Sequence, residues 1–145
     1  MAKVSILGRG LHQHEIEALL ELLRETGTCA GPVDIVEAVS GASDLDDAIV
    51  LILGTPATCA DSELEGNLAR TSASTQRAIW VWPERSTQPD APAAARKYCY
   101  SRVSWNAEKL RAVMADDDVI YIENANGDPL PAIETERNLC VDDEA

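Results

Sequence analysis

The stretch Ala48-Ile49-Val50-Leu51-Ile52-Leu53 decides the fold class of this chain. It is apolar without interruption, and Gly54-Thr55-Pro56 ends it. A strand of a parallel sheet is buried on both faces, so it does not show the alternation of a half-exposed strand. The run therefore predicts a central strand of a parallel sheet with helices packed on both sides.

Four other segments are strand-like, and helical patterns or turn signals separate them. The strand-like segments are 4–7, 33–37, 78–82 and 119–123. The helical segments are 12–25, which Gly27 ends, a short one opened by Ser43, then 61–71, one near Ala93, and 105–115, which Ser104 caps. This alternation predicts an α/β fold of three layers with a five-stranded, mainly parallel sheet in the flavodoxin-like order 2-1-3-4-5.

The length of 145 residues fits one domain. We expect a single α/β domain over 1–128 and an irregular acidic C-terminal extension over 129–145. The formal charge of -13 repels phosphate groups, so binding to a nucleic-acid backbone or to an anionic membrane surface is not expected.

The sequence also predicts where the protein resides. No apolar run approaches the ~18 residues that span a bilayer. Met1-Ala2-Lys3 leads directly into a strand-like run, so no signal peptide is expected. None of the 4 cysteines forms a CxxC pair, which indicates reduced thiols and no zinc site. We expect a cytoplasmic protein without a metal.

Ligands of such sheets bind outside the carboxyl ends of the strands, where the strand order reverses. Here that point lies between the first and third strands, where loop 8–14 meets loop 54–65. In the first loop, Gly8-Arg9-Gly10 could hold a phosphate, and a plain turn is the alternative. His12 and His14 read more simply as exposed histidines at a helix start than as metal ligands.

The second loop supplies Thr55 and three carboxylates, Asp61, Glu63 and Glu65. If Leu64 and Leu68 face inward, Glu65 lies nearer the buried edge of its helix than Glu63 does. A carboxylate there could stabilise an oxocarbenium-like centre, accept a sugar hydroxyl or attack an anomeric carbon. The alternative is that these are first-turn acids that interact favourably with the helix dipole.

Trp82 is the remaining candidate for ligand binding. It alternates with Trp80, so both side chains face one side of the fourth strand. Core packing is the default interpretation of such a pair. Trp82 lies at the carboxyl end of the strand, however, where it could stack on a base.

The middle of the chain resembles two related groups of proteins. The run 47–53, then Gly54-Thr55-Pro56, then Asp61-Ser62-Glu63-Leu64-Glu65-Gly66-Asn67-Leu68-Ala69, resembles nucleoside 2-deoxyribosyltransferases. In those enzymes a buried strand precedes a helix with a nucleophilic Glu, which here matches Glu65. The region is also similar to Toll/interleukin-1 receptor (TIR)-like domains, whose enzymes cleave the nicotinamide–ribose bond of NAD with a Glu on the corresponding helix.

The resemblance covers about residues 3–82 and is sharpest at 47–82. Two departures stand out. The small residue adjoins Glu65 at Gly66, where the transferases usually place Gly one position later. The serine- and tryptophan-rich TIR pattern before the Glu is missing.

The resemblance implies cleavage or transfer at an N-glycosidic bond of NAD, a nucleoside or a nucleotide, in a setting such as bacterial defence. Glu65 would be the nucleophile or stabiliser, Asp61 or Glu63 would orient a sugar hydroxyl, and Arg9 would hold a phosphate. No cofactor is required beyond NAD or a nucleotide as substrate or ligand.

The alternative is a non-catalytic module of the same fold that binds a nucleotide or docks on a protein partner or a second copy. The apolar residues within 126–145 favour docking. A phosphoryl-accepting receiver is excluded, because it needs an Asp where the third strand ends, and this chain has Leu53-Gly54 there.

Overall fold

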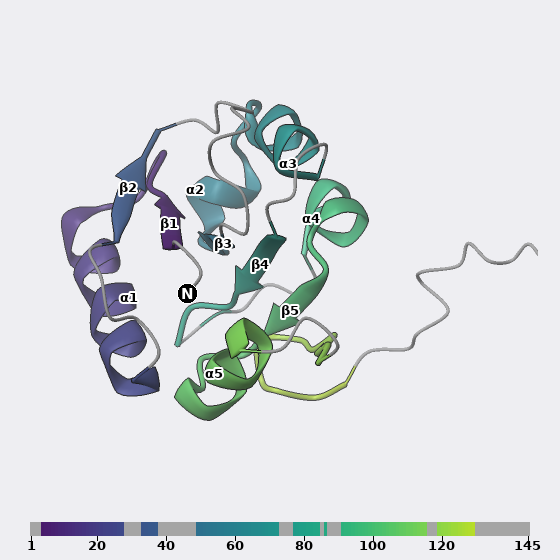
Figure 1. The fold of residues 1–145 in the computed structure, drawn as a ribbon. Helices are drawn as coiled ribbons and strands as arrows, with labels where there is room; N and C mark the ends of the chain where they lie inside the picture. Colours follow the sequence, from purple (N-terminus) through teal and green to yellow (C-terminus); the bar gives the residue numbers. More distant parts are fainter. Residues whose placement is uncertain are drawn as a thin grey trace, which may run out of the picture.

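The computed structural model describes residues 4–27, 33–37, 49–72, 77–84, 86, 91–115 and 119–129. One parallel sheet runs through this part of the chain in the order β2-β1-β3-β4-β5 (Figure 1). Its strands are β1 (Val4–Leu7), β2 (Asp34–Val36), β3 (Ile49–Leu53), β4 (Arg77–Val81) and β5 (Ser101–Val103). The described helices are α1 (Gln13–Thr26), α2 (Pro56–Cys59), α3 (Leu64–Ser72), α4 (Ala93–Tyr98) and α5 (Ala107–Ala115). The predicted α/β fold and flavodoxin-like strand order are confirmed.

Strand β3 is the centre of the sheet, as its apolar run predicts. All five of its residues are buried. Leu51 lies beside Ile6 of β1 on one side and beside Ile79 of β4 on the other. A strand flanked in this way, with helices above and below, has no side on which a polar residue would meet water.

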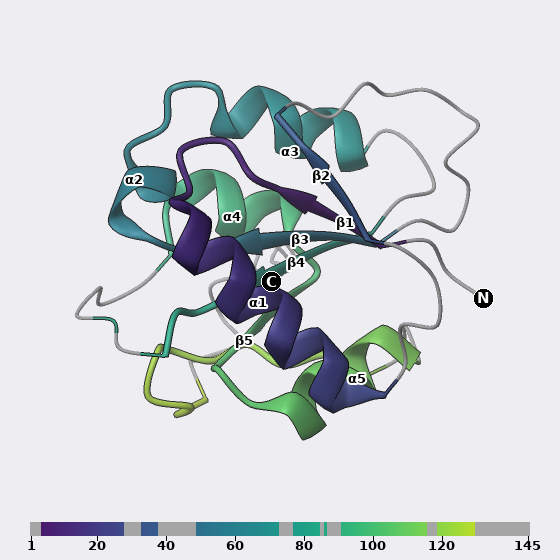
Figure 2. The ribbon, with the colours of Figure 1, turned by 90° about the vertical axis from the view of Figure 1, so that its left-hand side faces the viewer.

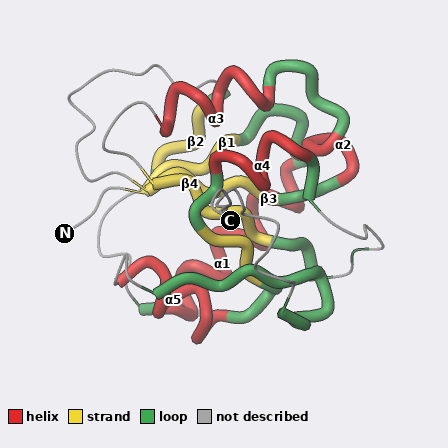
Figure 3. Tube along the Cα trace, turned by 90° about the vertical axis from the view of Figure 1, so that its right-hand side faces the viewer, coloured by secondary structure: helices red, strands yellow, loops and turns green. Residues whose placement is uncertain are grey.

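Helices cover both faces of the sheet. Helices α1 and α5 lie on one face, and α3 and α4 lie on the other (Figures 2 and 3). The first face packs the leucines of α1 and α5 against β1, β3 and β4. The second face packs Leu64 and Leu68 of α3 against Trp80 and Trp82. The predicted inward orientation of Leu64 and Leu68 is confirmed.

The C-terminal end of α1 and the N-terminal end of α5 can be compared with the sequence signals that predicted them. Helix α1 ends at Gly27, whose φ of +70° is the left-handed conformation that terminates many helices, as predicted. Helix α5 begins later than the sequence suggested. Asn106, not Ser104, accepts a hydrogen bond from a first-turn amide, that of Lys109, at 3.0 Å.

The predicted fifth strand over 119–123 is misplaced. The fifth strand is Ser101–Val103. It has no apolar pattern that would indicate a strand, because two of its three buried residues are polar. Residues 121–123 lie beyond it at the edge of the sheet. The Arg102 amide donates to the Tyr121 carbonyl at 2.7 Å, and the Glu123 amide donates to the Arg102 carbonyl at 3.0 Å. The segment thus continues the sheet by a parallel bridge without forming a full strand.

The remaining sequence predictions have simple outcomes. The short helix near Ala93 is confirmed. The helix that Ser43 would open lies outside the described residues, as does the predicted extension after Pro129. Within the described ranges, no helix has both the length and the apolarity required to cross a bilayer.

Candidate functional site

The candidate site lies at the carboxyl ends of β1 and β3, where the strand order reverses. Strand β1 has β2 on one side and β3 on the other. The loop from β1 to α1 and the loop from β3 through α2 to α3 therefore meet there, as the topology predicts. A Cβ added to Gly10 would stand 3.7 Å from the Cβ of Ala57, so the two loops lie close together.

The first loop is a tight turn held against β2. The Gly8 amide donates to the Val36 carbonyl at 2.7 Å, and the Leu11 amide donates to the Gly8 carbonyl at 3.0 Å. Gly10 has a φ of +81°, which favours glycine because a Cβ is strained there. A Cβ at Gly8 would stand 2.7 Å from the Cγ2 of Ile35, so close packing explains Gly8 and backbone conformation explains Gly10, both without a ligand.

The second loop begins with a single helical turn, α2, that the sequence did not predict. Thr55 is its N-cap, and the Thr55 Oγ1 accepts the Thr58 amide at 3.1 Å. The hydroxyls of Thr55 and Thr58 are also 3.1 Å apart. Pro56 at the first helical position suits this geometry. Thr55 is buried, so its hydroxyl caps the helix and is not open to a ligand.

An ion pair joins the two loops. Arg9 Nε donates to both carboxylate oxygens of Asp61, each at 3.0 Å. The Asp61 Oδ1 also accepts the amide of Glu63 at 3.0 Å, which stabilises the start of α3. The carboxylate of Asp61 raises the pKa of the Arg9 guanidinium by hydrogen bonding and by charge. The structure thus brings Arg9 and Asp61 together, and it makes them partners of each other.

Glu63 and Glu65 are both exposed at the N-terminal end of α3. Burial therefore does not single out Glu65 as the sequence suggested. Among the described residues, neither carboxylate has a hydrogen-bond partner. Glu65 is consequently accessible to a ligand, and its position is equally that of a first-turn acid favoured by the helix dipole.

The two histidines are stacked on each other. Their ring centroids are 5.6 Å apart, with an angle of 9° between the planes. His12 has an extended backbone as the N-cap of α1, so its ring reaches the same side as that of His14. Both residues are exposed, and the described residues contain no group of three or more His, Cys, Asp or Glu side chains arranged for a metal.

Trp82 lies in the core. It is fully buried, and its ring packs edge-on against Trp80 with centroids 5.7 Å apart, so the prediction that both face one side is confirmed. The Trp82 Nε1 donates to the carbonyl of Glu123 at 2.8 Å. This geometry supports core packing, since no face of the indole is open for a base to stack on.

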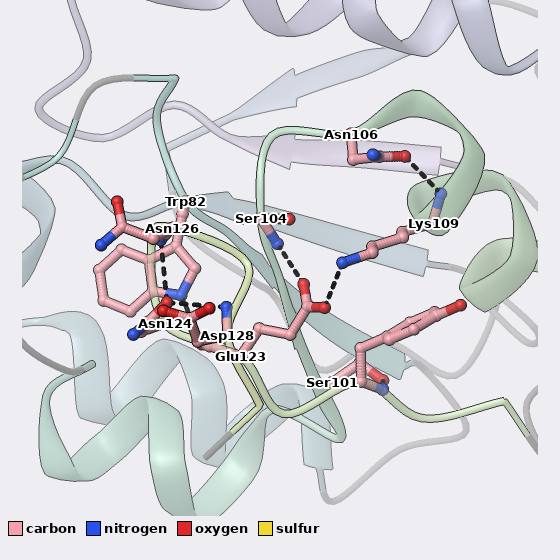
Figure 4. Close-up of polar contacts among 10 residues, drawn as sticks. Trp82, Ser101, Ser104, Asn106, Lys109, Glu123, Asn124, Asn126 and Asp128 are labelled. Atoms are coloured by element: carbon pink, nitrogen blue, oxygen red, sulfur yellow. Dashed lines mark hydrogen bonds and ion pairs between the residues drawn. The ribbon is translucent and has the colours of Figure 1, made fainter.

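A buried carboxylate that the sequence analysis did not single out lies beside β5. Glu123 is 4% exposed. Its Oε1 accepts the Ser104 amide at 3.0 Å, and its Oε2 accepts a hydrogen bond from Lys109 Nζ (Figure 4). In the same loop, Asn124 Oδ1 accepts the amides of Asn126 and Asp128. These hydrogen bonds hold residues 121–128 against the end of the sheet, so we assign Glu123 a structural role.

The two cysteines in the described ranges are unsuited to nucleophilic chemistry. Burial raises the pKa of the thiol of Cys59, the last residue of α2. Burial raises the pKa of Cys99 to about 12. A thiol attacks as its thiolate, so both shifts lower reactivity at neutral pH.

Comparison of the chain with protein-family models, with curated proteins and with solved structures found no match.

Proposed function

We propose that this protein cleaves or transfers an N-glycosidic bond of a nucleoside, a nucleotide or NAD at the carboxyl edge between β1 and β3. One observation carries the proposal. The Arg9–Asp61 pair joins the two loops at the switch point, and Asp61 also accepts the amide of Glu63, the residue before α3 begins at Leu64 and two before Glu65. Glu65 is thereby held at this edge with its carboxylate accessible.

The chemistry assigned to Glu65 is attack on the anomeric carbon, or stabilisation of positive charge there. In the first case a Glu65 oxygen bonds to the anomeric carbon as the bond to the base breaks, and the base leaves with the electron pair. Water, or a second base in a transferase, then displaces the carboxylate. Glu63, two residues earlier and also exposed, is assigned to a sugar hydroxyl.

The resemblance of 47–82 to nucleoside 2-deoxyribosyltransferases and TIR-like domains supports this assignment at Glu65 alone. Thr55 and Trp82 are buried, and their polar groups bind within the protein. A substrate contact from either one would require those bonds to break. The proposal therefore depends on the carboxylates of α3 and on the loop that follows β1.

A second candidate is a non-catalytic binding module of the same fold. The specific observation in its favour is that Glu65 is exposed and has no hydrogen-bond partner among the described residues, whereas catalytic carboxylates are usually held by neighbouring groups. A partner protein or a second copy of the chain could supply those groups.

The test is an incubation of the purified protein with NAD and a panel of nucleosides and nucleotides, followed by mass spectrometry. Glu65→Gln is run beside Glu108→Gln, which alters a matching exposed first-turn acid on α5. Release of a free base by the native protein and by Glu108→Gln, with at least a hundredfold loss in Glu65→Gln, supports catalysis. No base release by any of the three proteins, with a ligand of the panel retained by the protein, supports the binding module.

A further inference from the structure

The candidate site has an excess of negative charge around one cation. Loops 8–14 and 54–65 contain a single Lys or Arg, namely Arg9, and three carboxylates that follow β3. The charges of Asp61, Glu63 and Glu37 all act on the Arg9 guanidinium. A phosphate group that approached these described residues would meet one paired cation and several anions.

Asp61 is the more firmly positioned partner of the Arg9–Asp61 ion pair. The Asp61 side chain is 12% exposed, against 42% for Arg9, so the carboxylate is the more enclosed partner. Its Oδ1 also binds the Glu63 amide at the start of α3. Asp61 therefore cannot leave Arg9 by a simple rotation without also giving up the hydrogen bond that orders the first turn of α3.

We propose that Asp61 is a specificity-determining residue that keeps phosphate groups off Arg9. This inference rests on the proposed function in that it concerns the same site. A dianion placed next to Arg9 would be repelled by a carboxylate whose oxygens lie 3.0 Å from the guanidinium Nε. Of the substrates considered above, uncharged nucleosides fit this site and nucleotides and NAD do not.

Asp61→Asn is the decisive variant, because the amide keeps an oxygen for the Glu63 N–H and loses the charge opposite Arg9. Glu25→Gln is the matched control, since it removes one charge from an exposed position of α1. Inorganic phosphate is the probe, titrated at low ionic strength while the backbone amides of 8–11 and the Arg9 Nε–H are followed by NMR. Circular dichroism verifies that each variant is folded.

We expect Asp61→Asn to bind phosphate at Arg9 about tenfold or more tightly than the native protein and Glu25→Gln do. The inference is overturned if Asp61→Asn binds phosphate no more tightly than the native protein does. The same holds if neither protein binds phosphate. The probe needs no turnover, so the two proposals fail separately. If Asp61→Asn binds phosphate more tightly but no nucleoside releases its base, only the proposed function fails. If a base is released but Asp61→Asn does not bind phosphate more tightly, only this inference fails.

Discussion

The ring of Trp80 lies directly against the backbone of Gly54. A Cβ at Gly54 would stand 2.3 Å from Cζ2 and 2.6 Å from Nε1 of Trp80, closer than carbon atoms approach without a shift. Gly54 follows the central strand, and its amide donates to the Val81 carbonyl at 2.9 Å, so its backbone is fixed. The glycine that ends the apolar run is therefore required by the tryptophan of the neighbouring strand.

Gly54→Ala should destabilise the fold by about 1–3 kcal/mol, because neither the indole nor the strand can move aside easily. Urea unfolding followed by tryptophan fluorescence measures the change. Gly66→Ala is the control, since its Cβ would lie no closer than 3.6 Å to Arg70 in a helix where Ala is preferred to Gly. A Gly54→Ala protein as stable as Gly66→Ala would contradict the contact with Trp80.

Glu123→Ala should cost about 2–4 kcal/mol of unfolding free energy, because it leaves the Ser104 amide and Lys109 without their acceptor. Asp128→Ala, which removes an exposed acid from the same loop, should change stability by less than about 0.5 kcal/mol. Denaturant titration of both variants decides the matter. Equal stability of the two would show that Glu123 does not hold residues 121–128 to the sheet.

Glu65→Gln should leave stability within about 0.5 kcal/mol of the native value, because the carboxylate is exposed and interacts mainly with the helix dipole. Glu108→Gln on α5 should behave alike. Thermal unfolding of both variants tests this. A much larger loss in Glu65→Gln would mean that the carboxylate has a structural partner, and its loss of turnover could then not be assigned to chemistry.

The fold could be predicted where a segment carries its own signal. The uninterrupted run before Gly54 indicates a strand buried on both faces, and the leucine spacing of α1 with Gly27 after it indicates a helix and its end. Strand β5 carries no such signal, because Ser101 and Arg102 are buried polar residues in a strand of three. Helix α2 is one turn long, too short for any periodicity to show.

The site could be predicted only as far as topology determines it. Strand order places the loops after β1 and β3 together, and the structure confirms that they touch. Which side chains pair with each other could not be predicted. Arg9 and Asp61 are 52 residues apart, and nothing in the sequence of either loop indicates that they form an ion pair. The same holds for Trp82 and Glu123, 41 residues apart, whose hydrogen bond places the indole in the core.

The buried thiol of Cys99 should make the protein less stable in alkaline solution. Its pKa is raised to about 12 by burial, so the folded state keeps the proton where an unfolded thiol, with a pKa near 9.0, loses it. The unfolded state then binds fewer protons, and the free energy of unfolding falls as pH rises from about 9 to 12, by up to about 1.4 kcal/mol per pH unit. Cys99→Ala has no thiol at this position, so this pH dependence of stability is absent from it. Unfolding titrations at pH 8 and pH 10.5 should therefore show that the native protein loses more stability than Cys99→Ala. Burial also raises the pKa of the Cys59 thiol, so the loss in Cys59→Ala should fall between the losses of these two proteins. Parallel losses in the native protein and Cys99→Ala would show that the thiol ionises equally in both states.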